Sequence, residues 1–259
     1  MKRDNGPILN KSTANFPEVN FSDEGDIRHL HLGTIWIQGS MRLDDSTALV
    51  HEYIERMMAW LLFVDAATVS KRQALQLGLG AGSLTKYAAR VLRMKTTAIE
   101  LNPQVLHACR GWFKLPADNT RLQVILADAA QEIKNPRWWG TVDALQVDLY
   151  DHEAAAPVLD SADFYADCRR LLSADGSMTV NLFGRSSSYA RSVEKIAQAF
   201  GKSTLWSFKA TREGNTVVLA QRTPARPRRA VLAERAEIIE TRWGLPAAKW
   251  LRGFKPLVA

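Results

Sequence analysis

Two aspartates in the stretch "DALQVDLYDHE", Asp148 and Asp151, are the residues whose type and spacing most directly suggest chemistry. They follow an apolar run, Ala144 to Val147, that has the composition of a buried strand. Carboxylates placed at the end of such a strand can hold a cation or accept a proton from a reacting group. A solvated loop is the simpler alternative, and the neighbouring sequence argues against it.

A glycine-rich stretch, "LGLGAGS", ends an earlier predicted strand and places Gly78, Gly80 and Gly82 in the turn before a helix. Glycines there permit a tight turn and let a ligand approach the backbone amides at the helix N-terminus. The spacing is G-x-G-x-G, and Ser83 stands where a dinucleotide motif would have its third glycine. No Walker-type phosphate loop occurs either. An adenosyl sulfonium compound is therefore favoured over a nicotinamide dinucleotide.

Acidic residues end the next two predicted strands. Glu100 lies where a carboxylate can accept hydrogen bonds from ribose hydroxyls, and Asp128-Ala129 lies where a carboxylate could accept from an adenine amino group. Each has a structural alternative: Glu100 could favour the following helix N-terminus, and Asp128 could only cap the next helix. Because three such features end three successive strands, the sequence predicts an adenosine site.

The order of the elements predicts an α/β fold with a doubly wound, mostly parallel, Rossmann-like sheet and helices on both faces. In such sheets ligands bind at the carboxyl ends of the strands. The strands are expected at 73–79, 96–101, 121–127, 142–147 and 177–183 and near 205 and 217, and the helices at 83–94, 103–113, 162–172 and 188–200.

Three segments of the chain are expected. An N-terminal segment, 1–66, contains a polar, unpatterned stretch to about residue 28, a short β-hairpin over 29–43 and an amphipathic helix over 45–63. A Rossmann-like catalytic domain covers 67–222. A basic C-terminal tail, 223–259, is expected to hold helices at 233–243 and 247–251.

The composition, 46% hydrophobic and 24% charged over 259 residues, is that of an ordinary globular protein. The chain has no apolar stretch long enough to cross a membrane and no apolar core of a secretion signal, so a cytoplasmic protein is expected. The two cysteines, Cys109 and Cys168, are far apart and lack metal-site spacing, so neither a disulfide framework nor a metal site is expected.

The formal net charge of +7 is concentrated at the C-terminus, because residues 222–259 hold nine Lys or Arg and three Glu. The remainder is nearly neutral. This segment contains no recognisable nucleic-acid motif, so we expect a solvated basic tail and no nucleic-acid partner.

With "LGLGAGS", "AIELNP", "LADA" and "DALQVDLYDHE" in that order, the chain resembles the polyamine aminopropyltransferases, the spermidine synthase family, which share the fold of class I methyltransferases. The resemblance covers about Ile37 to Gln221. Upstream, "IQGS" and "HEYI" look like the family's Gln and His-Glu elements, and "FYADCRRLLSADGSMTV" is similar to its later helix, glycine turn and strand.

The resemblance implies transfer of an aminopropyl group from decarboxylated S-adenosylmethionine to a polyamine such as putrescine, without a metal, by a homodimer. It implies that Asp148 orients and helps deprotonate the attacking amine and that Asp151 holds the polyamine chain. Tyr150 is expected to line the amine channel, although a packing role is an equal alternative. Gln38 and His51, matched to the family's Gln and His, are expected to contact the substrate, His51 at its amine end, although a lone histidine is more often structural.

The chain departs from the family pattern in three places. Ala81 stands where the glycine loop usually carries an aspartate, Val50 where a tyrosine is common, and Arg212 near a tyrosine position. Each change removes a contact to a cationic substrate. S-adenosylmethionine itself carries a carboxylate that prefers glycine-loop amides, so Ala81 leaves the form of the donor open.

Two alternatives to aminopropyl transfer remain from the sequence. One is an S-adenosylmethionine-dependent methyltransferase that acts on a small amine. The other is a non-catalytic protein that binds a nucleoside. The products separate the first from aminopropyl transfer, and binding without turnover would identify the second.

Overall fold

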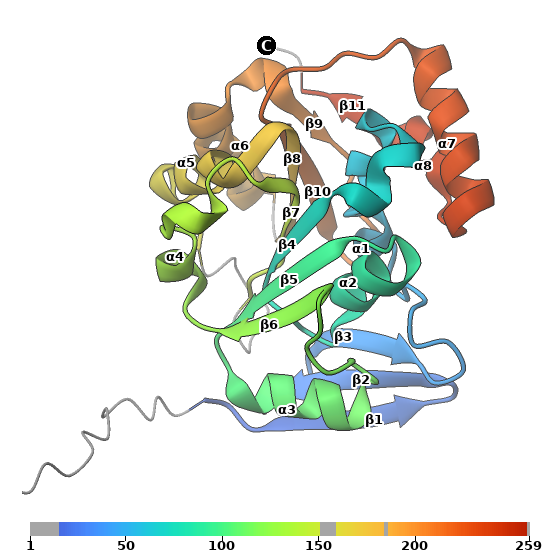
Figure 1. Ribbon diagram of the computed structural model, residues 1–259, viewed down its shortest axis with the longest axis vertical. Coiled ribbons are helices and arrows are strands. Elements are labelled where there is room, and N and C mark those ends of the chain that lie inside the picture. The colour runs from blue at the N-terminus through green and yellow to red at the C-terminus, as the bar shows by residue number, and fades with distance from the viewer. Residues whose placement is uncertain (1–15, 151–158, 184–185, 258–259) are drawn as a thin grey trace, which may run out of the picture.

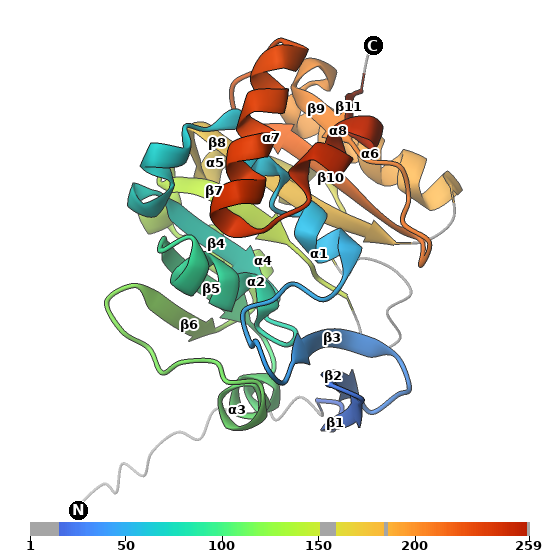
Figure 2. The same cartoon turned by 90° about the vertical axis from the view of Figure 1, so that its right-hand side faces the viewer.

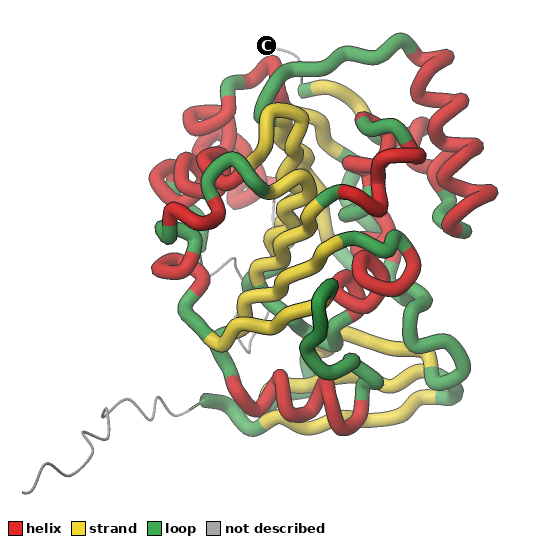
Figure 3. The backbone as a smooth tube through the Cα atoms, viewed as in Figure 1, coloured by secondary structure: helices red, strands yellow, loops and turns green. Residues whose placement is uncertain are grey.

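The computed structural model describes residues 16–150, 159–183 and 186–257. Its centre is an eight-stranded sheet in the order β11-β9-β10-β8-β7-β4-β5-β6, which Figure 3 shows in yellow between layers of helices. The five strands from β8 to β6 pair in parallel, and β10, β9 and β11 add antiparallel pairs at one edge. The strands are β4 (Gln73–Leu77), β5 (Lys95–Glu100), β6 (Leu122–Leu126), β7 (Val142–Val147), β8 (Leu172–Phe183), β9 (Leu205–Ser207), β10 (Asn215–Gln221) and β11 (Lys255–Pro256).

The strand order reverses between β4 and β7. The chain builds outward from β4 through β5 to β6 and then returns to place β7 on the other side of β4. The connections that leave β4 and β7 therefore diverge and open a crevice at the carboxyl ends of these strands. These ends carry Gly78 and Asp148, and the Asp148 amide still donates to the Leu77 carbonyl at 3.0 Å.

Helices cover both faces of the sheet (Figure 1). On one face α4, α5 and α6 pack on the core around Leu145 and Val180, and on the other α1, α2, α7 and α8 pack on the core around Met58 and Trp60. The predicted doubly wound fold is confirmed. The helices are α1 (Glu52–Arg56), α2 (Ser83–Lys86), α3 (Pro103–Trp112), α4 (Ala129–Glu132), α5 (Ala162–Leu171), α6 (Ser186–Phe200), α7 (Arg229–Trp243) and α8 (Ala247–Gly253), with short 3₁₀ or π turns at Ala59–Phe63, Ala66–Lys71, Tyr87–Val91, Pro136–Trp138 and Lys202–Thr204.

The N-terminal region forms a separate antiparallel sheet of β1 (Val19–Glu24), β2 (Ile27–Leu32) and β3 (Ile37–Arg42), which lies beside α3 (Figure 2). The predicted hairpin corresponds to β2 and β3. The stretch expected to be unpatterned up to about residue 28 contains a regular strand over 19–24, because β1 pairs with β2 along its whole length. The β1 side chains are mostly exposed, so the strand has little apolar patterning to reveal it.

The predicted helix over 45–63 is shorter than expected. The α-helical part is α1, and Ala59–Phe63 is a 3₁₀ turn. The Met57 carbonyl accepts hydrogen bonds from the side chains of Thr179 and Gln146, at 3.0 and 3.2 Å. Its hydrogen-bond partners therefore come from β8 and β7 and not from the next helical turn. Nearly every side chain from Met57 to Leu62 is buried, which a one-sided helix would not allow.

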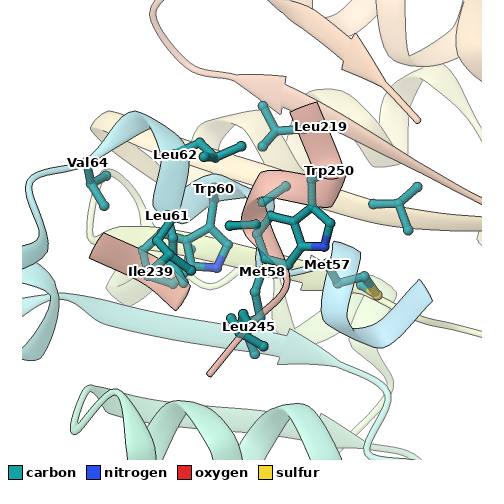
Figure 4. Close-up of a cluster of buried hydrophobic side chains, with 14 of the residues drawn as sticks. Met57, Met58, Trp60, Leu61, Leu62, Val64, Leu219, Ile239, Leu245 and Trp250 are labelled. Atoms are coloured by element: carbon teal, nitrogen blue, oxygen red, sulfur yellow. The ribbon is translucent and has the colours of Figure 1, made fainter. Parts of the chain in front are cut away.

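The C-terminal segment is not a solvated tail, which corrects the sequence-based expectation. Its apolar side chains Leu232, Ile239, Trp250 and Phe254 are at most 7% exposed and belong to the same buried cluster as Met57 to Leu62. Figure 4 shows Ile239 and Trp250 beside that stretch. Burial of each such side chain stabilises the fold by about 1.5–3 kcal/mol. Most basic residues of α7 and α8 are exposed, but Arg235 is half-buried and donates to the Leu62 carbonyl at 2.9 Å. The charge of the segment therefore did not reveal that it is packed on the core. No helix in the described part of the chain is long and apolar enough to span a membrane.

Candidate active site

A cavity of about 1010 Å³ lies at the carboxyl ends of β4, β5, β6 and β7, bounded on the other side by β3 and the residues around the start of α1. Gly82 lies outside its lining, at the N-cap of α2 with φ of 69°. Asp151 lies outside the described residues. The other sequence-predicted site residues all line the cavity, namely Gln38, His51, Gly78, Gly80, Glu100, Asp128, Ala129, Asp148 and Tyr150.

Asp148 follows the last residue of β7, and its carboxylate is held by two neutral donors. Asn181 Nδ2 donates to Oδ1 at 2.9 Å, and the Tyr53 hydroxyl donates to Oδ2 at 3.5 Å. Burial raises the pKa of Asp148 to about 6, and the two hydrogen bonds partly oppose that rise. A carboxylate with such a pKa is ionised at neutral pH and is a much better proton acceptor than a solvated aspartate.

Tyr53 and Asn181 are site residues that were not predicted from the sequence. Tyr53 falls inside the amphipathic helix predicted over 45–63, and its position two residues after His51 in "HEYI" was the available signal. Asn181 is a polar residue inside the apolar strand "SMTVNLF", and this break in the apolar run was the available signal. Its own Oδ1 accepts from Asn215 Nδ2 at 3.1 Å, so β10 supports the side chain that holds Asp148.

Tyr150 lines the cavity and also packs on the end of β8. Its ring lines the cavity, while its hydroxyl donates to the Asn181 carbonyl at 2.8 Å and accepts from the Phe183 amide at 2.7 Å. Both hydrogen bonds of the Tyr150 hydroxyl are therefore made with the backbone at the end of β8. Tyr150 therefore shapes the cavity wall and fixes the strand that carries Asn181.

Glu100 joins the glycine turn to the start of α3. Its Oε2 accepts from the Leu79 amide at 2.9 Å, and its Oε1 accepts from the Asn102 amide at 2.8 Å. Burial raises the pKa of Glu100, and these backbone bonds oppose the rise. Each carboxylate oxygen can accept a second hydrogen bond, so the side chain remains able to bind ribose hydroxyls from its place in the cavity wall.

Asp128 caps a helix and also lines the cavity. Its side chain caps α4 by accepting from the Ala130 amide at 2.8 Å, and the residue lines the cavity together with Ala129. The end of β6 thus contributes a carboxylate and a small apolar residue beside the Glu100 carboxylate, an arrangement suited to a nucleoside.

The glycine turn, residues 78–82, is packed against both sheets, which leaves room only for glycine at certain positions. Gly78 has φ of 90°, and a Cβ there would overlap the Asp148 carbonyl oxygen. A Cβ on Gly80 would lie 3.0 Å from the Gln38 carbonyl oxygen, so β3 rests directly on the turn. The glycine turn therefore contacts both the end of β7 that carries Asp148 and the backbone of Gln38.

Among the residues that the structure describes, the charged side chains of the cavity wall are all acidic. Five carboxylates line it, and none of the described lining residues is a lysine or an arginine. The described residues also hold no group of three or more His, Cys, Asp or Glu side chains placed to bind a metal ion. Such a wall favours a cationic ligand over an anionic one. The five carboxylates belong to Glu52, Glu100, Asp128, Asp148 and Glu213.

The sequence and the fold of this chain are similar to those of polyamine aminopropyltransferases and spermidine synthases. The chain is 36% identical over 249 residues to a polyamine aminopropyltransferase of Neisseria meningitidis, an alignment that covers 95% of this chain and 92% of that protein. The fold matches a probable spermidine synthase from Corynebacterium glutamicum with a TM-score of 0.73, 18% identity and coverage of 92% and 87%. It also matches a spermidine synthase in complex with the transition state analogue AdoDATO, with a TM-score of 0.67, 14% identity and coverage of 92% and 83%. No protein-family model matches the chain.

Proposed function

The chain belongs to the polyamine aminopropyltransferase family, and from this premise we propose that it transfers an aminopropyl group from decarboxylated S-adenosylmethionine to a polyamine such as putrescine. The protein is a transferase, and its nucleoside ligand is related to S-adenosylmethionine. The observation that carries the proposal is the half-buried Asp148 carboxylate, whose pKa is raised, in a cavity whose described charged lining residues are all acidic.

The charged residues and backbone amides of the cavity wall support the decarboxylated form of the donor. Decarboxylated S-adenosylmethionine carries a sulfonium and an amine, whereas S-adenosylmethionine adds a carboxylate. That carboxylate would find no lysine or arginine among the described lining residues. Three amides of the glycine turn, those of Gly78, Leu79 and Gly82, already donate within the protein, which leaves fewer to bind an anion. The negative wall therefore favours the decarboxylated donor although Ala81 replaces the family aspartate.

The reaction suits these residues. An ammonium group of the acceptor gives a proton to Asp148, and the amine nitrogen attacks the carbon beside the sulfonium. The new C–N bond forms as the C–S bond breaks, and its electron pair moves to sulfur, which leaves neutral methylthioadenosine. Asp148 accepts from Asn181 and Tyr53, so its oxygens are fixed before the acceptor arrives. The proton leaves to solvent when the product does.

Calorimetric titration with decarboxylated S-adenosylmethionine, S-adenosylmethionine and methylthioadenosine, each with and without putrescine, tests this proposal. We expect the decarboxylated donor to bind at least about tenfold more tightly than S-adenosylmethionine, because about 1.4 kcal/mol of unfavourable charge interaction is enough for that ratio. Turnover should release methylthioadenosine. Tighter binding of S-adenosylmethionine with release of S-adenosylhomocysteine would identify a methyltransferase, and binding without turnover would identify a non-catalytic protein.

The pH dependence of kcat/KM for the donor should show an acidic limb with a midpoint near 6. Below that pH Asp148 is protonated and cannot accept the acceptor's proton, so the rate should fall about tenfold for each further pH unit. The Asn181→Ala variant loses the stronger donor to the charged carboxylate, so the pKa of Asp148 rises and the limb should move to higher pH.

Two Tyr→Phe variants control the pH experiment. Tyr53→Phe removes the longer hydrogen bond to Asp148 and should move the limb upward by less than Asn181→Ala does. Tyr189→Phe removes a hydroxyl that bonds Ser207 instead, so its limb should stay in place. An unmoved limb in Asn181→Ala would show that another group controls the acidic side. The homodimer implied by the family resemblance and the cytoplasmic location expected from the sequence composition stay predictions.

A further inference from the structure

Three side chains of the N-terminal region form a buried hydrogen-bonded chain that ends at the cavity. His29 on β2 faces Ser40 on β3 as its cross-strand partner, and His29 Nδ1 lies 2.8 Å from Ser40 Oγ. The same Ser40 Oγ lies 2.7 Å from Nε2 of His51. His29 and Ser40 are 7% and 1% exposed and do not line the cavity, whereas His51 does.

His51 occupies the N-cap position of α1, but its side chain makes no capping hydrogen bond. The ring is directed instead to Ser40 through Nε2. The other ring nitrogen, Nδ1, makes no hydrogen bond with the described residues, and the His51 side chain belongs to the cavity wall, so Nδ1 is the nitrogen that can bind a molecule in the cavity. Whether Nδ1 donates or accepts depends on which nitrogen carries the proton, and the partner of Nε2 decides this.

The outer end of the chain favours one direction. His29 Nε2 lies 3.7 Å from a carboxylate oxygen of the exposed Glu24, beyond hydrogen-bond distance, but the negative charge favours a proton on the ring nitrogen that faces it. With that proton on Nε2, His29 Nδ1 accepts the Ser40 hydroxyl proton. Since the hydroxyl has a single proton, Ser40 Oγ accepts from His51 Nε2. His51 is left with a lone pair on Nδ1.

The surroundings of His51 suit a cationic partner. Burial lowers the pKa of His51 and favours the neutral ring, His29 adds to this effect, and Glu213 opposes it. Glu213, on the turn between β9 and β10, lines the same cavity, and its pKa is lowered mainly by hydrogen bonds of its own turn and slightly by His51. Glu52 and Tyr53, which follow His51, also line the cavity. A ligand ammonium can donate to Nδ1 while it faces these carboxylates.

We propose that His29 and Ser40 are positioning residues that fix the tautomer of His51, so that His51 accepts a hydrogen bond from a ligand ammonium group beside Glu213. This inference rests on the proposed function for the identity of the ligand. Both substrates of an aminopropyl transfer carry such a group, at the end of the donor's aminopropyl arm and at the ends of the acceptor. Kinetics with each substrate varied in turn distinguish the two sources.

The first test reads the tautomer in the unaltered protein. Two-bond ¹⁵N–¹H correlation spectra of the ¹⁵N-histidine-labelled full chain should show His51 protonated on Nε2 and unprotonated on Nδ1. In Ser40→Ala this preference should be lost, whereas Ser40→Thr, which keeps the hydroxyl, should retain it. A proton on Nδ1 of His51 in the unaltered protein would overturn the proposal, even if a variant failed to fold.

The second test is kinetic. Ser40→Ala should raise the KM of one amine substrate about five- to tenfold, while kcat stays within about twofold. This is the loss expected when the neutral hydrogen bond between Ser40 and His51, which holds the tautomer, is removed. The substrate whose KM rises identifies the bound ammonium. Ser22→Ala removes a matched serine–histidine bond on the same sheet, 2.8 Å from Ser22 Oγ to His31 Nε2, and should leave both KM values unchanged. Unchanged KM values in Ser40→Ala would also overturn the proposal.

The two tests also separate this inference from the proposed function. If the unaltered protein transfers no aminopropyl group to any amine, the proposed function fails, while the spectra still report the tautomer of His51. If the transfer occurs and the tautomer is the opposite one, only the positioning role of His29 and Ser40 fails.

Discussion

Replacing Asp148 with asparagine is expected to lower turnover at least about a thousandfold, within the range known for loss of a general base. The amide keeps the shape of the side chain and can still accept from Asn181, but it cannot take the proton of the attacking amine. Donor affinity should change by less than about threefold, because Glu100 and Asp128 lie at the ends of other strands. Single-turnover kinetics and calorimetry measure the two quantities on one preparation.

Asp143→Asn is the matched control for this variant. Asp143 lies on the same strand, near its opposite end, where it accepts from Arg72, the Gln73 amide and Ser173 and does not line the cavity. Its loss should lower the melting temperature and leave turnover per folded molecule unchanged. Near-normal turnover in Asp148→Asn would contradict the role given to Asp148, and equal loss in both variants would indicate damage to β7 instead.

Gly78→Ala is expected to lower the free energy of unfolding by about 3 kcal/mol and to abolish activity. Two costs add here. Alanine at φ of 90° is strained by about 1–3 kcal/mol, and relief of an overlap in a packed region costs a similar amount. The new Cβ would push on the Asp148 carbonyl, so the catalytic carboxylate would move with the backbone. Urea unfolding followed by circular dichroism gives the change in stability.

Gly140→Ala separates the two costs. Gly140 also has a positive φ, of 69°, but a Cβ there would meet no atom within 4 Å. This variant should lose only about 1 kcal/mol, the conformational part, and should keep its activity. If both glycine variants were destabilised equally, contact between the glycine turn and the end of β7 would not be the cause.

The elements nearest the site were predictable because their signals are local. A glycine turn, an acidic residue and a D-x-x-D sequence each follow directly from a run of apolar residues, and parallel strands bring their carboxyl ends to one edge. Glu100, Asp128 and Asp148 could therefore be placed in one cavity from their positions at successive strand ends. Their hydrogen-bond partners could not be placed, because Asn181 lies 33 residues after Asp148 and reaches it only through the pairing of β7 with β8.

The sequence by itself determined the alternation of strands and helices, the glycine turn and the carboxylates at the strand ends, because spacing along the chain fixes all of these. Only the tertiary structure decided that β1 is a strand, that Met57 to Leu62 are buried beneath the C-terminal helices, and that Ser40 joins two histidines. These features depend on which surfaces meet after folding. Burial and cross-strand partners arise between residues far apart in the chain, and no local periodicity records them.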